Sequence, residues 1–145
     1  MRVAINGFGR IGRAVFRIAL ENGLNVVAIN DLHGKDDAAY LLKYDSVYGK
    51  YKGIVKKFDG GLVVNGKKIR ILSEAEPLKL PWLDMKVDVV IESTGVFRNP
   101  DDALKHIEVG AKYVLITAPC KGGKPDLTIV PGVNGHLLKK NCKIF

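Results

Sequence analysis

A glycine-rich turn between two apolar segments constrains the fold of this chain more than any other feature of its sequence. Residues 2–6, RVAIN, form a short β-branched and apolar run that is typical of a buried strand. GFGRIG follows at residues 7–12, and the next ten residues carry apolar side chains at helical spacing. LNVVAIN at residues 24–30 predicts a second strand. A strand, a helix and a strand within about thirty residues predict a βαβ unit, and hence a parallel sheet.

The middle of the chain interrupts this pattern. Residues 61–72, GLVVNGKKIRIL, read as two strands joined by Asn65-Gly66, which is the strongest short signal for a β-hairpin. A further strand is expected in GIVKKF just before them, and a short helix is expected from Asp36. The sequence therefore predicts an antiparallel excursion within a parallel fold.

Regular α/β alternation resumes in the last third of the chain. A helix is expected to begin with Asn99 as N-cap and Pro100 at its first position. Strands are expected before and after it from Val87 and Tyr113, and also at residues 127–130 and 143–145. We predict one domain, residues 1–145, with a Rossmann-type, doubly wound, mostly parallel α/β sheet, an inserted antiparallel hairpin and helices on both faces.

The glycine motif has the surroundings that dinucleotide binding requires, because Asp31 ends the second strand 19 positions after Gly12. Gly7 permits the tight turn, Gly9 lets a pyrophosphate approach the backbone, and Gly12 lets the helix pack close to the strand. The helix N-terminus offers N–H groups to the phosphates. Asp31 can accept hydrogen bonds from a ribose diol, and its charge would repel a 2′-phosphate. These residues predict a site for NAD rather than NADP.

Two further segments follow predicted strands, where ligands bind in doubly wound folds. In ESTGVF at residues 92–97, Thr94 and Gly95 are candidates to line the cofactor cleft, and Phe97 is a candidate to pack against adenine. A capping turn with a core phenylalanine explains the same spacing equally well. Thr117, in TAPC, is a candidate for the nicotinamide end.

Composition narrows the other possibilities. The net charge is +8, but the basic residues are scattered and have little aromatic interleaving, so nucleic acid is not favoured as the primary partner. No apolar run approaches the length of a membrane span, and no secretion signal is visible. Two cysteines, Cys120 and Cys142, are too few for a disulfide framework, which favours a cytoplasmic location. No Cys/His pattern marks either thiol as a nucleophile, and the three histidines lack metal-ligand spacing.

Taken together, the motifs closely resemble the N-terminal, cofactor-binding half of phosphorylating glyceraldehyde-3-phosphate dehydrogenase. The resemblance runs across all 145 residues in family order, through INGFGRIGR, AIND, LLKYDSVYGKYKG, NGKKI, PWLD, ESTGVF, GAKYVLITAP and TIVPGVN. KYDSVYG and ESTGVF are far more specific than the glycine motif.

This resemblance implies roles for particular residues. Arg10 and Ile11 match the pair that contacts the dinucleotide, with Ile11 under the nicotinamide ring. Asp31 matches the residue that holds the adenosine ribose, and Thr117 matches a hydroxyl residue near the nicotinamide. The adenine-side wall is matched by Thr94, Gly95 and Phe97. Ala75 stands where the family usually has arginine, so a backbone contact is retained at that position and a side-chain contact is lost.

The resemblance also implies a larger enzyme of glycolysis. In the family, the strand matching residues 143–145 leads into a segment that carries the catalytic cysteine, and a later histidine is its base. The chain is therefore expected to bind NAD but not to catalyse, without the catalytic domain and the family's homotetramer. Two alternatives stay open: a free-standing dinucleotide-binding module, such as a redox sensor or nucleic-acid binder, and the same half of erythrose-4-phosphate dehydrogenase.

Overall fold

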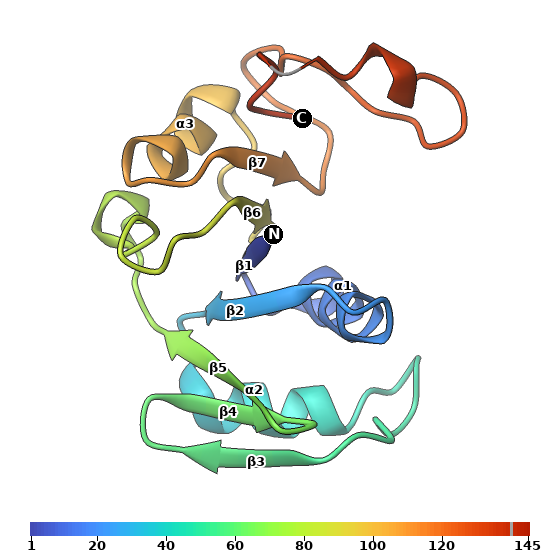
Figure 1. The fold of residues 1–145 in the computed structure, drawn as a ribbon, viewed down its shortest axis with the longest axis vertical. Coiled ribbons are helices and arrows are strands. Elements are labelled where there is room, and N and C mark those ends of the chain that lie inside the picture. Colours follow the sequence, from blue (N-terminus) through green and yellow to red (C-terminus); the bar gives the residue numbers. More distant parts are fainter. Residues whose placement is uncertain (140) are drawn as a thin grey trace.

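The structure is a computed structural model that describes residues 1–139 and 141–145. The described residues form seven strands in one sheet (Figure 1). From one edge to the other the strands are β3 (Val55–Phe58), β4 (Gly61–Val64), β5 (Lys67–Leu72), β2 (Asn25–Asn30), β1 (Arg2–Asn6), β6 (Val89–Glu92) and β7 (Tyr113–Ile116).

β1 is the point at which the strand order reverses. It pairs in parallel with β2 on one side and with β6 on the other. β5 extends the parallel sheet beyond β2, and β7 extends it beyond β6. The chain first places β2 and β5 on one side of β1 and later returns to place β6 on the other side. Because the strand order reverses at β1, a crevice opens at the carboxyl ends of β1, β2 and β6. This arrangement confirms the predicted doubly wound fold.

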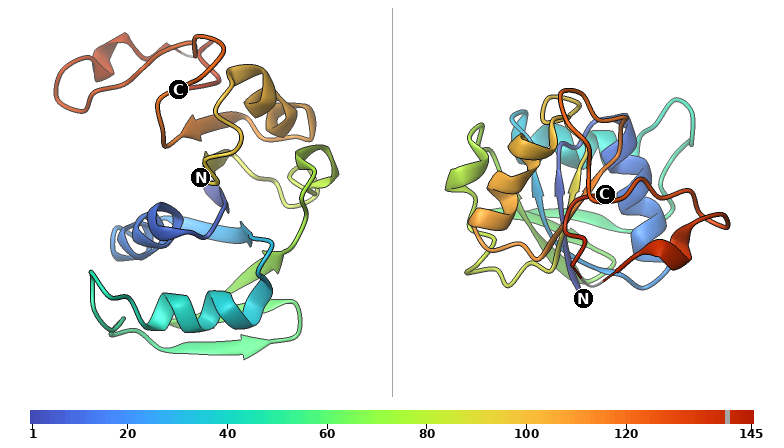
Figure 2. Two further views of the ribbon diagram at one scale, coloured as in Figure 1. Left: turned by 180° about the vertical axis from the view of Figure 1, so that it is seen from behind. Right: turned by 90° about the horizontal axis from the view of Figure 1, so that it is seen from above.

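Helices cover both faces of the sheet. α1 (Arg10–Glu21) and α2 (Gly34–Lys43) pack on one face, and α3 (Pro100–Glu108) packs on the other with the short 3-10 helix η1 (Pro77–Lys79). The right-hand view of Figure 2 shows α1 in blue and α3 in orange on opposite sides of the strands. Two separate hydrophobic clusters result, one on each face, with Phe16 fully buried in the first and Trp82 fully buried in the second.

The start of α3 follows the predicted capping chemistry. The Asn99 side chain accepts a hydrogen bond from the backbone N–H of Asp101 at 3.1 Å, and Pro100 occupies the first turn. Asp101 and Asp102 follow there and complement the positive end of the helix dipole. The amino-acid sequence alone therefore locates the first residue of this helix.

The predicted hairpin joins β4 to β5. Asn65 and Gly66 both have positive φ, +50° and +82°, as a two-residue hairpin turn requires. β3 and β4 are also antiparallel, whereas β5 pairs in parallel with β2. The antiparallel strands therefore form one edge of the main sheet, and β5 belongs to both parts.

We expect Gly66→Ala to lower the free energy of unfolding by about 1–2 kcal/mol, because an L side chain is strained in the left-handed region. A Cβ at Gly66 would meet no atom within 4 Å, so backbone strain alone is tested. Gly135, the first residue of the 3-10 helix η2 (Gly135–Leu137), is equally open but has no positive φ. Urea unfolding should show a clear loss for Gly66→Ala and almost none for Gly135→Ala; equal effects would contradict the turn geometry.

Two predicted strands do not form: residues 127–130 contain no strand, and residues 143–145 make only a single bridge. Residues 127–130 form no strand, because a turn satisfies their backbone groups instead. The Asn134 side chain accepts a hydrogen bond from Val130 N and donates one to the carbonyl of Thr128, at 2.7 and 2.9 Å. Residues 143–145 lie along the outer edge of β7, but only Ile144 makes a bridge there, to Val114. The segment after β7 thus lies at one end of the sheet, drawn in red in Figure 1.

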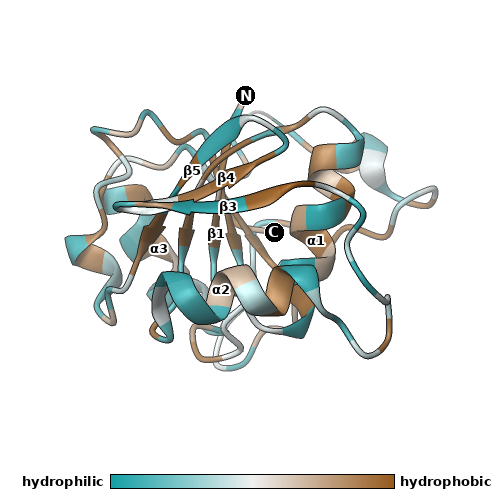
Figure 3. Ribbon diagram, turned by 90° about the horizontal axis from the view of Figure 1, so that it is seen from below, coloured by the Kyte–Doolittle hydropathy of each residue, from teal (hydrophilic) through white to brown (hydrophobic). Residues whose placement is uncertain are grey.

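Hydropathy follows the layered arrangement. Figure 3 shows hydrophobic residues along the strands in the middle of the sheet and a mixture of both kinds along α2. Ala38 and Leu42 are the buried residues of α2, whereas Asp36 and Asp37 lie in its first turn. Within residues 1–139 and 141–145, no helix has the length and apolar character needed to cross a membrane.

Candidate functional site

A cleft of about 530 Å³ lies at the carboxyl ends of β1, β2 and β6. It occupies the crevice that the strand order creates. Six of the residues predicted from the sequence line it: Gly7, Gly9, Asp31, Ala75, Thr94 and Phe97. The structure therefore brings the glycine motif, the acidic residue and the segment after β6 together around one cavity.

The three glycines of the motif have different structural roles. Gly7 has φ +92°, and a Cβ there would lie 2.6 Å from the backbone nitrogen of Thr94. A Cβ at Gly12 would overlap the carbonyl oxygen of Gly7. A Cβ at Gly9 would meet no atom within 4 Å. Gly7 and Gly12 thus hold the turn, the helix and the segment after β6 close together, and Gly9 leaves open space on the cleft.

The N-terminus of α1 begins at this open space. Gly9 is its N-cap, no side-chain hydrogen bond caps the helix, and its first turn contains no acidic residue. Arg10 and Ile11 follow on the exposed surface, and half of the Ile11 side chain is accessible. The uncapped N–H groups and the helix dipole favour an anion at this position.

Asp31 is held in place by the glycine turn itself. Its Oδ2 accepts a hydrogen bond from Phe8 N at 2.7 Å, and its Oδ1 accepts from His33 N and Nδ1 at 3.0 and 2.9 Å. Burial raises the pKa of Asp31, but the hydrogen bonds from Phe8 and His33 outweigh it and hold the pKa below its ordinary value. The carboxylate is therefore charged near neutral pH, and its side chain keeps 17% exposure towards the cleft.

The opposite wall follows β6. The backbone N–H and the hydroxyl of Thr94 both donate to Oε1 of Glu92. Phe97 lines the cleft and packs edge-to-face on the buried ring of His106. Gly95, with φ +75°, is exposed and does not line the cavity. Phe97 is thus a wall residue of the cleft that also packs on the buried interior.

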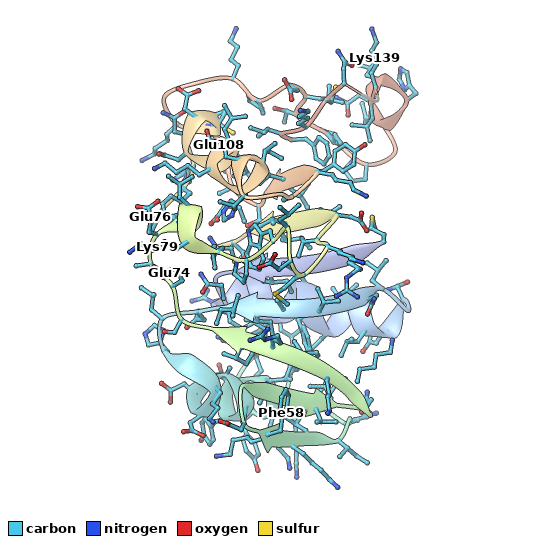
Figure 4. All side chains as sticks on the ribbon, turned by 60° about the vertical axis from the view of Figure 1, so that its left-hand side comes forward. Phe58, Glu74, Glu76, Lys79, Glu108 and Lys139 are labelled. Carbon is cyan, nitrogen blue, oxygen red and sulfur yellow. The ribbon has the colours of Figure 1, made fainter. Side chains whose placement is uncertain are left out.

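The third wall is the segment between β5 and η1. Glu74 and Glu76 of this segment are labelled along one side of the molecule in Figure 4. The side chain of Asn30 bonds to both the backbone N and O of Glu74, each at 2.8 Å. Ala75 follows with an exposed methyl group and lines the cleft. An alanine here gives this wall a short side chain in the cleft that Asp31 also lines.

Thr117 lies outside this cleft. Its hydroxyl donates to the carbonyl of Glu92 at 3.1 Å, and the residue lines a separate cavity of about 390 Å³ that also contains Cys120. Arg10, Ile11 and Gly12 are likewise absent from the lining of the main cleft. Of the residues matched to the adenosine side, Asp31, Ala75, Thr94 and Phe97 therefore share one cavity and Gly95 does not line it. Arg10, Ile11 and Thr117, which are matched to the nicotinamide side, do not line it either.

The structure also adds residues that the sequence reasoning missed. Asn6, Asn30 and His33 line the cleft, and Glu92 lies directly behind Thr94. A signal for three of them was present: Asn6, Asn30 and Glu92 are polar residues that each end a buried apolar strand. Such a residue requires a hydrogen-bonding partner in the interior.

Comparison with known proteins gives the same family. Residues 1–100 match the family described as "Glyceraldehyde 3-phosphate dehydrogenase, NAD binding domain". The chain is 55% identical to glyceraldehyde-3-phosphate dehydrogenase of Thermotoga maritima, over 99% of this chain and 44% of that protein. It is 55% identical to the cytosolic enzyme of Trypanosoma brucei brucei, over 92% of this chain and 40% of that protein. For the enzyme of Borreliella burgdorferi the identity is 49%, over 99% of this chain and 44% of that protein.

The chain thus spans less than half the length of these relatives. Its matched region covers the glycine turn, Asp31, Ala75 and the segment after β6, which together surround the cleft. The chain therefore belongs to the glyceraldehyde-3-phosphate dehydrogenase family, a family of NAD-dependent oxidoreductases, and corresponds to its NAD-binding domain.

Proposed function

We propose that this chain is the NAD-binding domain of an enzyme that oxidises glyceraldehyde 3-phosphate with NAD and phosphate to 1,3-bisphosphoglycerate. The observation that carries the proposal is the Asp31 carboxylate, which Phe8 and His33 hold in the lining of a cleft that Gly9 also lines. The compared relatives are named glyceraldehyde-3-phosphate dehydrogenases, which favours this substrate over erythrose 4-phosphate.

The residues of the cleft fit the adenosine half of NAD. The pyrophosphate is proposed to lie over Gly9 and the N-terminus of α1, where a Cβ would find open space. The ribose diol is proposed to bind Asp31, with adenine between Phe97 and Ala75. NAD supplies the hydride acceptor of the reaction. The chain's own residues bind and orient the cofactor.

The residues proposed for the nicotinamide end are assigned from the resemblance to the family. Ile11 is proposed to lie under the nicotinamide ring, with Arg10 beside the dinucleotide and Thr117 near the ring. Thr94 and Gly95 are proposed to complete the adenine side. Half of the Ile11 side chain is exposed next to Gly9, which suits an apolar surface for a ring.

The covalent chemistry is proposed to come from a catalytic domain outside these 145 residues, in a homotetramer. Cys120 and Cys142 are free thiols. His106 is fully buried and bonded to Trp82, so it is not placed to act as a base for either thiol. We propose that neither cysteine is the nucleophile.

An Asp31→Ala variant is expected to bind NAD about 10- to 100-fold more weakly, the range for losing hydrogen bonds to a charged group. It is also expected to narrow the preference for NAD over NADP, because the charge that repels a 2′-phosphate is gone. Isothermal titration of the purified protein with each dinucleotide measures both effects.

Two variants make this test specific. Asp31→Asn removes the negative charge but keeps an oxygen that can accept the hydrogen bond from Phe8 N. It therefore separates the effect of the charge from the effect of losing the hydrogen bond to the glycine turn. Asp59→Ala removes the same charge from a fully exposed side chain that does not line the cleft, and is expected to leave NAD affinity unchanged. Wild-type NAD affinity in Asp31→Ala would exclude the ribose assignment.

A further inference from the structure

Buried polar side chains form a continuous hydrogen-bonded chain beneath the cleft. The Nδ2 of Asn30 donates to Oδ1 of Asn6 at 2.7 Å, and the Nδ2 of Asn6 donates to Oε2 of Glu92 at 2.6 Å. All three side chains are at least 95% buried. Asn30, Asn6 and Glu92 are the last residues of β2, β1 and β6. The network of their side chains therefore crosses the point at which the strand order of the sheet reverses.

Each end of this hydrogen-bonded network bonds to a different segment that lines the cleft. At one end, Asn30 bonds to both backbone groups of Glu74. At the other end, Oε1 of Glu92 accepts from the backbone N–H and the hydroxyl of Thr94. Glu74 and Thr94 line the same cavity, and the strands that they follow, β5 and β6, lie on either side of β2 and β1. The two walls are therefore joined through buried side chains and not only through the backbone of the sheet.

His106 and Trp82 fix the direction of the hydrogen bonds at Glu92. The indole Nε1 of Trp82 can only donate, and it lies 3.0 Å from Nδ1 of His106. Nδ1 is thus an acceptor, and the neutral ring carries its proton on Nε2, which donates to Oε2 of Glu92 at 3.2 Å. Oε2 then accepts from both Asn6 and His106, which leaves Oε1 for Thr94.

We propose that Asn6, Asn30 and Glu92 are positioning residues that set the spacing of the two cleft walls before NAD arrives. The inference rests on the proposed function, because it assigns the cleft to the adenosine half of NAD. A cleft that is already in its bound shape loses less conformational entropy on binding. Asn6 is the central link, since its side chain hydrogen-bonds to Asn30 and Glu92, which in turn bond to Glu74 and Thr94.

The direction of the bond between Asn6 and Glu92 gives a test. Asn6→Asp places the carboxylate at position 6 against the carboxylate of Glu92, so that two acceptors face each other. Glu92→Gln places an amide N–H group where Asn6, His106 and Thr94 already donate, so that donors face each other. The double variant reverses the bond, so that an amide at position 92 donates to a carboxylate at position 6, with the net charge unchanged. The ring nitrogen Nε2 of His106 lies 3.4 Å from the Asn6 side chain and can donate there instead.

The first readout is amide hydrogen exchange at Thr94 and Glu74 in the protein without cofactor. Each single variant is expected to raise the exchange rate of both amides about tenfold or more, and the double variant is expected to return both to within about threefold of wild type. NAD affinity is expected to follow the same pattern. Val114→Ala, a fully buried change on β7 outside the network, should lower the melting temperature without changing either amide or the NAD affinity.

The outcomes separate this inference from the proposed function. If Asn6→Asp changes only one of the two amides, or if the effects of the singles simply add in the double variant, the positioning role is wrong. If both amides respond as expected and the wild-type protein does not bind NAD, the proposed function is wrong and the linked walls remain. Should the singles fail to fold, Asn30→Ser is the milder variant: faster exchange at Thr94 as well as Glu74 supports the link, and a change at Glu74 alone overturns it.

Discussion

The Gly12→Ala variant is expected to lose about 3 kcal/mol or more of its free energy of unfolding, the upper part of the range for inserting a group into a packed interior. The added Cβ would overlap the carbonyl oxygen of Gly7 and lie 2.9 Å from the Ser93 hydroxyl. That hydroxyl already donates to the Gly7 carbonyl at 2.7 Å, so neither group can move without breaking a contact between the segments that follow β1 and β6. Urea unfolding followed by circular dichroism measures the loss.

Gly9→Ala is the matched control for this prediction. Gly9 has φ −69° and open space around its Cβ position, so the free energy of unfolding should change by less than about 0.5 kcal/mol. NAD affinity should nevertheless fall, because the methyl group would stand where the pyrophosphate is proposed to approach. Similar stability losses in the Gly9 and Gly12 variants would contradict the separate roles of the two glycines.

Trp82→Ala is expected to cost about 3–5 kcal/mol of stability, the range for removing a large aromatic side chain from a core. Trp82 is completely buried in the cluster on the α3 face, and its indole donates to His106. The variant therefore leaves both a cavity and an unsatisfied acceptor. Thermal and chemical unfolding should both show the loss.

Trp82→Phe separates these two contributions. It keeps most of the aromatic volume and removes the donor to Nδ1 of His106, so we expect a smaller loss of about 1–3 kcal/mol. Leu83→Ala provides the control, since Leu83 is the next residue and is 71% exposed. If Trp82→Phe were as stable as the wild type, the hydrogen bond to His106 would have no measurable role in the fold.

Local patterns predicted much of the fold, because they act through neighbouring residues. Asn99 and Pro100 mark the start of α3, and Asn65-Gly66 marks a turn that needs positive φ at both positions. Residues 127–130 show the opposite case. Their β-branched composition favours a strand, but Asn134 satisfies the backbone of Thr128 and Val130 within a turn. Propensity alone does not reveal that competing contact.

Cleft-lining residues could be predicted where they belong to a motif whose residues are close together in the sequence and have a fixed geometry. Gly7, Gly9 and Asp31 line the cleft, and their spacing reflects one βαβ unit. Glu92 and Asn30 were missed, because their importance arises from partners that are 14 to 86 positions away and that no periodicity records. The polar ends of buried strands were the available signal, and only the sheet order shows that these ends meet.

The link between Asn6 and Glu92 also bears on how the cleft is assembled during folding. These residues are 86 positions apart, and the walls that they support belong to segments on either side of β1. Contacts of such high sequence separation form late and slowly, since the intervening loop must close first. A nascent chain that ends before β6 would contain the whole glycine motif and Asp31 but no enclosed cleft. We therefore expect cofactor recognition to appear only after β6 has paired with β1.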